Sequence, residues 1–377
     1  MGNNFSSLEE QYINTKILIG FQKNIKINEL NALLQCLCHI KALADYAKYK
    51  FDKIEDIQSY KTFHKSKKCL TDSFKDIIEK IWPKDVKGKS DESLKTFSKT
   101  EESKDFIEMI YKINPNYNEN QNLLIDFIIM RLHEELNKVQ DPNKNSNNSY
   151  AMKAVTDKNT ALKNYRDKFA KENQSKISDY FYGTYYNLTF CYGCQRYLYV
   201  FQPYMYGRYS LDQVFNYKCQ SYYWGKNILY MNKPINFNEV NIYDCLFFDL
   251  QIQTSFQTCT NCKFMNNIQK KNIIFVSPII LTFIFNKNVF LQNISFSFEE
   301  RINISQLVEK QINITYELIG IIFNPFENHY VAYCKNPIDN KWYSYDDDKV
   351  EAKNNFEEIR MIIGCPYMLF YQRCSNT

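Results

Sequence analysis

The sequence predicts an α+β fold, with helices in the first half of the chain and strands in the second. Before residue 180, apolar residues recur at helical spacing in two long segments. After residue 180, short runs rich in β-branched and aromatic residues dominate. Helices followed by strands favour a largely antiparallel sheet over alternating βαβ units.

The first predicted helix begins at Asn28, whose side chain can cap its N-terminus. Its apolar residues share one helical face, at Leu30, Leu33, Leu34, Leu37 and Ile40. A second helix is predicted within residues 113–139. The polar stretch 61–104 is expected mostly at the surface, and residues 140–160 are expected to form a loop.

The predicted strands all follow residue 180. They lie at residues 197–201, 247–252, 273–276, 279–285, 318–323 and 367–371. The most apolar run, residues 273–285, has 13 residues and contains a proline, so it is too short to span a membrane. It is expected to be buried strand, and no transmembrane helix is expected.

Composition indicates a folded intracellular protein. The chain has 377 residues, 45% of them apolar and 24% charged, which suffices for a large core. The net charge of 47 − 42 = +5 is spread without a basic block, so no nucleic-acid partner is expected. Twelve cysteines without a signal peptide favour a reducing compartment, the cytoplasm or an organelle-associated complex, over secretion.

The N-terminus carries a possible lipidation signal. Residues 1–6, Met-Gly-Asn-Asn-Phe-Ser, fit the acceptor pattern for N-myristoylation at Gly2. The alternative interpretation is an unmodified, frayed terminus. One myristoyl chain gives only marginal membrane binding, and membrane contact is expected only if Gly2 is acylated.

Four cysteines stand in two pairs with metal-ligand spacing, Cys191 with Cys194 and Cys259 with Cys262. Two thiolate pairs at this spacing suit one tetrahedral zinc ion, because each short turn presents two sulfurs to the same point. The alternatives are four free buried thiols, or a site in which one of the two intervening cysteines, Cys219 and Cys245, substitutes.

His329 and Asp346 form the second candidate pair. A histidine on one strand and a carboxylate on the next can pair across a hairpin, as the base and the orienting acid of a nucleophilic triad do. Taken alone, a histidine followed by aromatic residues is more often part of the core.

Several motifs together resemble the ubiquitin-specific proteases, papain-like cysteine hydrolases. Residues 316–320 through 328–333 to 342–348 look like the family's histidine box, with a separation of 346 − 329 = 17. Residues 366–373 resemble the last core strand, 175–183 the entry to the zinc-bearing fingers, and 277–283 the strand after the fingers. The matches run in family order from about residue 18 to 374.

The resemblance implies the family's architecture of thumb, palm and fingers. Residues 1–17 would form an N-terminal extension and residues 18–374 the protease-like domain. Within that domain, the thumb is expected at about 18–180, the fingers at about 184–270 and the palm at about 271–374. The paired cysteines would hold the structural zinc ion of the fingers.

The resemblance also implies that the catalytic apparatus is missing. Counting back without gaps from residues 31–37, the family's cysteine falls on Asn28 and its oxyanion-stabilising asparagine on Lys23. An amide is neither acidic nor nucleophilic. The two acidic positions that hold ubiquitin's basic tail become Asn120 and Leu123, so recognition of the tail should be weakened.

The sequence therefore predicts a catalytically inactive member of this family that serves as a structural or scaffolding subunit of a larger protein assembly. His329 and Asp346 would be remnants that satisfy each other. Two alternatives stay open: a non-cleaving binder of ubiquitin or a ubiquitin-like protein, and an active isopeptidase with an unanticipated nucleophile. Cys36, deep in an apolar helix, is expected to be buried rather than to replace the lost cysteine.

Overall fold

The protein is described by a computed structural model, in which residues 18–21, 28–50, 69–82, 102–113, 124–139, 152–223, 236, 238–286, 295–309, 313–326, 329–362 and 365–374 are placed. The chain divides into two compact units. The first holds residues 1–140, 175–177 and 319–366, and the second holds residues 141–174, 178–318 and 367–377.

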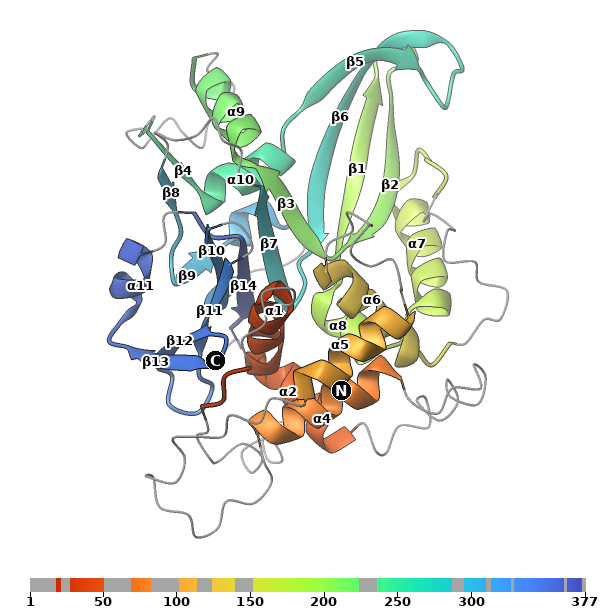
Figure 1. Ribbon diagram of the computed structural model, residues 1–377. Helices are drawn as coiled ribbons and strands as arrows, with labels where there is room; N and C mark the ends of the chain where they lie inside the picture. The colour runs from red at the N-terminus through yellow and green to blue at the C-terminus, as the bar shows by residue number, and fades with distance from the viewer. Residues whose placement is uncertain are drawn as a thin grey trace. The chain divides into compact units, whose positions relative to one another are not determined.

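Helices make up the N-terminal part of the first unit (Figure 1). They are α1 (Asn28–His39), α2 (Lys41–Lys50), α4 (Leu70–Ile81), α5 (Glu102–Ile113) and α6 (Leu124–Glu135). α1 begins at the predicted residue, and its Leu33, Leu34 and Leu37 are completely buried. The helix predicted within residues 113–139 is α6.

The expectation that residues 61–104 lie mostly at the surface is wrong for α4. Its apolar residues recur at helical spacing and are buried, at Leu70, Phe74, Ile77, Ile78 and Ile81. The lysines and acidic residues between them make the segment polar on average while leaving one face apolar. Periodicity, and not mean composition, decides its burial.

A buried carboxylate on α6 holds the N-terminus of α4. Glu135 accepts hydrogen bonds from the backbone N–H groups of Leu70, at 3.1 Å, and Thr71, at 2.8 Å. It also accepts from the Thr71 hydroxyl at 2.7 Å and from Nε of Arg131 at 2.8 Å. The first N–H groups of a helix have no partner within it, so this carboxylate satisfies them and fixes α4 against α6.

Antiparallel strands complete the first unit. In order across the sheet they are β13 (Lys349–Lys353), β12 (Trp342–Asp346), β11 (His329–Lys335) and β10 (Thr315–Phe326). The first four residues of β10 belong to the second unit. α11 (Phe356–Ile362) follows β13, and α1 packs against β11.

A four-stranded antiparallel sheet is the largest element of the second unit (Figure 1). Its order is β2 (Arg196–Tyr204), β1 (Gly183–Cys191), β6 (Met265–Val276) and β5 (Gln253–Thr258). α7 (Lys158–Glu172) packs against β2. Four aromatic residues and one alanine form their shared core: Tyr165, Tyr186, Phe201, Phe275 and Ala161.

Further strands and helices complete the second unit. β3 (Tyr206–Ser210) runs parallel to β7 (Ile280–Asn286), and β14 (Met368–Arg373) runs antiparallel to β7. β9 (Arg301–Asn303) pairs with the start of β10, and β4 (Glu239–Asn241) pairs with β8 (Ser295–Ser297). The helices are α9 (Leu211–Tyr223), α10 (Ile242–Asp249) and the 3₁₀ turn η7 (Ser305–Leu307), while α8 (Lys176–Phe181) has residues in both units.

The strand predicted at residues 247–252 is wrong, because α10 occupies its first half and the rest is turn and irregular chain. A capping box starts this helix: Asn241 accepts from the N–H of Asp244 at 3.0 Å, and Asp244 accepts from the N–H of Asn241 at 2.9 Å. Lys218 of α9 reinforces it with an ion pair to Asp244 at 2.9 Å. Capping and packing outweigh the β propensity of the aromatic run.

The other predicted strands are confirmed, in β2, β6, β7, β10 and β14, and so is the α+β class. The apolar run 273–285 forms the end of β6 and most of β7, whose first six residues are buried. Across the described ranges, no helix is both long and apolar enough to cross a lipid bilayer.

Candidate functional site

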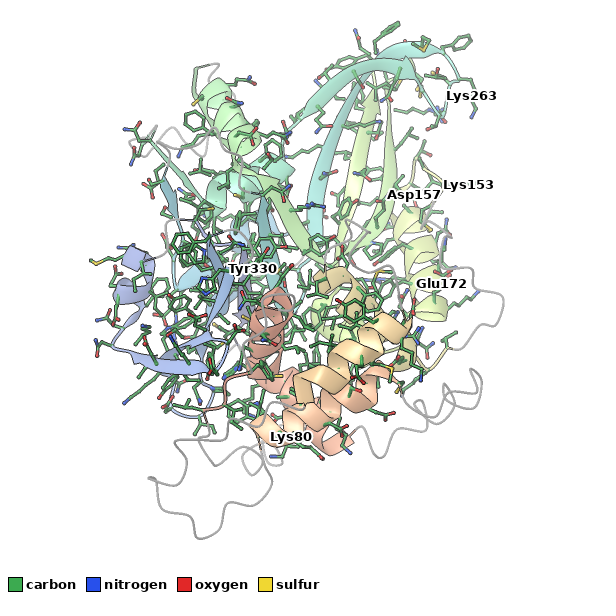
Figure 2. All side chains as sticks on the ribbon, viewed as in Figure 1. Lys80, Lys153, Asp157, Glu172, Lys263 and Tyr330 are labelled. Atoms are coloured by element: carbon green, nitrogen blue, oxygen red, sulfur yellow. The ribbon has the colours of Figure 1, made fainter. Side chains whose placement is uncertain are left out.

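Asn28, which the sequence predicts to stand in the position of the family's cysteine, is the first residue of α1 and is 4% exposed. Its Oδ1 atom accepts a hydrogen bond from the backbone N–H of Tyr330 on β11; Figure 2 labels Tyr330. The sequence allowed Asn28 to cap its own helix, but its oxygen is directed to β11. The side chain therefore joins the start of α1 to the strand that carries His329.

His329 and Asp346 form the predicted pair. Nε2 of His329 lies 2.8 Å from Oδ1 of Asp346, on the neighbouring strands β11 and β12. Both side chains are partly open to solvent, 39% and 41% exposed. The ring of Phe326, at the end of β10, lies parallel to the imidazole with a centroid distance of 6.4 Å. The structure thus brings Asn28, His329 and Asp346 to one end of the sheet in the first unit.

The thiols of Cys36 and Cys38 on α1 and of Cys334 on β11 are buried in the core of the first unit. Cys36 is 1% exposed, and its sulfur lies 3.8 Å from the carbonyl oxygen of Ile321 and 3.8 Å from the sulfur of Cys334. Burial raises the pKa of Cys38 and of Cys334 well above the ordinary thiol value. The expected burial of Cys36 is confirmed by its low exposure. A buried thiol is a poor nucleophile because water and substrate do not reach it.

Asp347 is a site residue that the sequence did not single out. It sits in the turn between β12 and β13 with φ 52°, and its Oδ1 accepts from Nδ2 of Asn31 at 2.8 Å. A Cβ atom at Gly20 would clash with the carbonyl oxygen of Asp347. One helical turn after Asn31, Gln35 donates to the carbonyl oxygen of Ile19 at 2.7 Å. These contacts hold the segment before α1 against the β12–β13 turn.

Adjacent aspartates in this turn have different partners. Asp346, on the strand, pairs with His329, whereas Asp347, in the turn, binds Asn31. The run of three aspartates at 346–348 was the available signal, but the sequence alone does not say which carboxylate faces which partner.

Four predicted site residues lie outside the described residues. They are Lys23 at the oxyanion position, Asn120 and Leu123 at the tail-binding positions, and Gly2 at the lipidation position. The geometry around Asn28 and His329 is therefore the part of the candidate site that the structure describes.

The chemistry available to this arrangement is limited by Asn28. A histidine held by a carboxylate can accept a proton from a neighbouring thiol and activate it. An asparagine amide at the cysteine position has no such proton to give and no nucleophilic sulfur. Its oxygen, moreover, is used by the backbone of β11. The described geometry thus places a histidine and a carboxylate, which could act as base and orienting acid, near an amide that cannot act as a nucleophile.

The predicted cysteine pairs meet in the second unit. The sulfurs of Cys191, Cys194, Cys259 and Cys262 all lie within 4.8 Å of one another. Cys191 ends β1 and Cys194 follows in the turn to β2, while the second pair lies in the turn between β5 and β6. Cys219, on α9, and Cys245, on α10, are not in this group.

The arrangement of these sulfurs fits a structural metal ion. Sulfurs bound at about 2.3 Å to one tetrahedral zinc ion lie within about 4 Å of each other, close to the separation found here. Cys191 and Cys259 are completely buried beside Leu198 and Ile268. Four thiol ligands and a shielded interior are the donor set of a closed, structural site.

Comparison with known proteins identifies the family of this chain. The sequence profile of the family described as Ubiquitin carboxyl-terminal hydrolase matches residues 28–371. Ubiquitin carboxyl-terminal hydrolase 2 of Bos taurus is 23% identical over 378 residues, an alignment that covers 92% of this chain and 53% of the relative. The chain therefore spans about half the length of this relative.

Solved structures share the fold. A SAGA DUB module of Ubp8, Sgf11, Sus1 and Sgf73 bound to monoubiquitin gives a TM-score of 0.62 at 16% identity, covering 98% of this chain and 73% of the other. A yeast SAGA DUB module with an Sgf73 mutant gives 0.61 at 17% identity, covering 95% and 69%. These similarities show the fold that the sequence motifs implied. The chain belongs to the ubiquitin carboxyl-terminal hydrolase family, as a member of the ubiquitin-specific protease type.

Proposed function

We propose that this protein is a catalytically silent member of the family that acts as a protein-binding subunit of a larger assembly. The observation that carries the proposal is Asn28, which stands in the cysteine position and bonds to the backbone of β11. Acyl transfer in this family type needs a thiolate at that position, and no rotation of an amide provides one.

The losses are selective, which supports a retained fold with a changed role. The His329–Asp346 pair persists as a structural contact between β11 and β12. In the sequence, Lys23, Asn120 and Leu123 replace residues that would stabilise the oxyanion and bind the ubiquitin tail. A protein that keeps the core strands and the cysteine cluster, but not these groups, is suited to binding rather than turnover.

The assembly role draws on the relatives. The solved modules that share this fold contain Ubp8 together with Sgf11, Sus1 and Sgf73, so a chain of this fold can work as one subunit among several. We propose protein partners of this general kind, without transferring those particular partners to this chain. The thumb, fingers and palm would lie at the boundaries given above, and one zinc ion would hold the finger turns.

A second candidate function is recognition of ubiquitin without cleavage. It is favoured by a hollow of about 810 Å³ in the second unit, beside the four-stranded sheet. Tyr186, Lys271 and Ile273 of the sheet and Glu309 after η7 contribute to its lining. One of the structures with this fold is bound to monoubiquitin. A hollow of this size can receive a loop or a few side chains of a partner protein.

Calorimetric titration with monoubiquitin separates the two candidates. For the scaffolding role we expect no saturable heat. We also expect the protein, when it is isolated from its native source, to elute from gel filtration well ahead of a 377-residue monomer. Saturable binding of ubiquitin would favour the reader. A native chain that elutes as a monomer and does not bind ubiquitin would contradict both functions.

A further inference from the structure

The outer end of the four-stranded sheet carries large apolar side chains in solvent. Phe264 is 72% exposed, Phe256 66%, Met265 53% and Tyr192 48%. These four residues, here called the knuckle patch, lie in or beside the two turns that hold the cysteine cluster. Single exposed apolar residues are ordinary, whereas a local group of them marks an interaction site.

The fold places these residues at one end of the sheet. Thr258 and Met265 face each other where β5 and β6 meet, and the N–H of Cys259 donates to the carbonyl oxygen of Phe264 at 2.9 Å. In the other turn, the N–H of Tyr192 donates to the carbonyl oxygen of Asn267 at 3.1 Å. The turn between β1 and β2 is therefore bonded to the start of β6, two residues from Met265. Nδ2 of Asn261, in the turn between β5 and β6, lies 3.6 Å from the sulfur of Cys194 in the turn between β1 and β2, so the patch is built from both turns.

The side chains of the knuckle patch are not part of the buried cluster inside these turns. Their buried cluster consists of Cys191, Leu198, Cys259 and Ile268. None of the four patch residues belongs to it. The exposed side chains are thus available to a partner at no loss to the packing around the sulfurs.

The lysine, arginine, aspartate and glutamate side chains of the sheet and its two turns are all of the basic kind. The segments 183–204 and 250–276, which contain all four strands and both turns, include four basic residues and no acidic one. Two of the basic residues, Arg196 and Lys263, are exposed in or beside the turns, and Figure 2 shows Lys263 at the outer end of the sheet. A zinc ion with four thiolates would carry 2 − 4 = −2, so these segments would keep 4 − 2 = +2.

We propose that the knuckle patch docks this protein on an anionic membrane surface. Phenylalanine, tyrosine and methionine side chains at a projecting turn can enter the boundary between headgroups and acyl chains, while arginine and lysine stay at the level of the phosphates. The absence of acidic residues removes the repulsion that an anionic bilayer would otherwise exert.

The inference goes beyond the proposed function and does not depend on catalytic silence. The knuckle patch would also supply the second membrane-binding signal that a single myristoyl chain lacks. A myristoyl chain binds membranes only marginally and needs a second signal, such as a basic surface, for stable attachment. If Gly2 is acylated, the knuckle patch is that second signal; without acylation, it binds anionic bilayers weakly and reversibly.

Vesicle sedimentation tests the proposal with the 377-residue chain carrying Gly2→Ala, which cannot be myristoylated. At low salt, we expect binding to vesicles with about one-third phosphatidylserine and none to vesicles of phosphatidylcholine alone. Phe264→Ser with Met265→Ser should weaken binding about ten-fold or more, because two partly inserted side chains are lost. The matched control, Phe326→Ser with Met361→Ser, removes a phenylalanine and a methionine that are 73% and 84% exposed elsewhere and should bind normally.

Charge is tested separately. Arg196→Gln with Lys263→Asn should weaken binding several-fold, and asparagine suits the left-handed backbone at residue 263, where φ is 65°. Lys163→Gln with Arg166→Gln, a pair exposed on α7, is the control and should have no effect. Unchanged zinc content and melting temperature in each variant would show that the turns remain folded.

Three results would overturn the proposal. They are no binding to phosphatidylserine vesicles, equal loss in patch and control variants, and patch-dependent binding of monoubiquitin or polyuridylate without vesicle binding. The last result would assign the patch to a protein or an RNA. Reactivity toward a ubiquitin probe, which tests catalytic silence, is an independent readout.

Discussion

The Oδ1 atom of Asn28 accepts a hydrogen bond from the backbone N–H of Tyr330, 302 residues further along the chain. Asn28, which we propose stands in the nucleophile position, thereby forms a structural link between α1 and β11. His329 stands next to Tyr330, so the link lies beside the surviving His329–Asp346 pair.

Replacing Asn28 tests this structural role. Asn28→Ala leaves the N–H of Tyr330 without its acceptor, and we expect the free energy of unfolding to fall by about 1–3 kcal/mol in a urea titration. Asn28→Asp is the control, because it keeps an acceptor and places a negative charge at a helix N-terminus, where it is favourable. Equal stability of the alanine variant and the natural protein would show that the link does not contribute.

Restoring the cysteine should not restore the enzyme. Asn28→Cys supplies a thiol next to the strand of His329, but in the proposed alignment Lys23 still replaces the oxyanion asparagine, and Asn120 and Leu123 still replace the acidic tail-binding residues. We expect hydrolysis of a fluorogenic ubiquitin C-terminal amide to stay near background. Turnover close to that of active family members would show that these other losses matter little.

Metal binding should depend on the cysteine cluster. We expect about one equivalent of zinc in the purified protein by elemental analysis. Cys259→Ser with Cys262→Ser should abolish it and lower the melting temperature, because the ion holds the two turns together. Cys219→Ser, outside the cluster, should keep the metal. Stable protein without metal would refute the zinc assignment.

Stability should fall in acid because of His39. This residue is 3% exposed, and its ring nitrogens lie 2.7 Å from the carbonyl oxygen of Gln35 and 3.0 Å from the hydroxyl of Tyr345. Burial lowers its pKa from 6.5 to about 4, although the Gln35 contact opposes the shift. The unfolded chain therefore binds a proton at a pH where the folded chain does not.

The sign follows from this difference in proton binding. The contribution of neutral His39 is fully present above pH 6.5 and is lost as the pH falls to about 4. Its size is at most roughly 3.5 kcal/mol, at about 1.4 kcal/mol per pKa unit. His39→Gln should flatten the dependence of unfolding free energy on pH in this window. An unchanged pH dependence in the variant would assign the effect to other groups.

Local patterns in the sequence predicted much of the fold. α1 and the strands β7, β10 and β14 have a consistent period or a strong β-branched and aromatic content, so neighbouring residues determine them. Mean composition does not predict the burial of α4, because its lysines and acidic residues conceal an apolar face. β propensity does not predict α10, because its capping box, Asn241 with Asp244, starts before the aromatic run.

The candidate site was predictable to the extent that spacing determines it. Two cysteine pairs and a histidine followed 17 residues later by an aspartate give specific geometry on folding. The contact of Asn28 with Tyr330 and that of Asn31 with Asp347 join residues about 300 positions apart. No local pattern encodes such pairs, because each depends on how α1 packs against β11 and its neighbouring turn.

Catalytic silence is tested most directly by incubating the native, zinc-loaded chain with a ubiquitin probe that carries a C-terminal electrophile. Intact-mass measurement reports any covalent adduct, and an active family member serves as the positive control. With Asn28 in the nucleophile position and Cys36 buried, we expect no adduct on any of the twelve cysteines. A stoichiometric adduct on one cysteine would contradict the account and identify a working nucleophile.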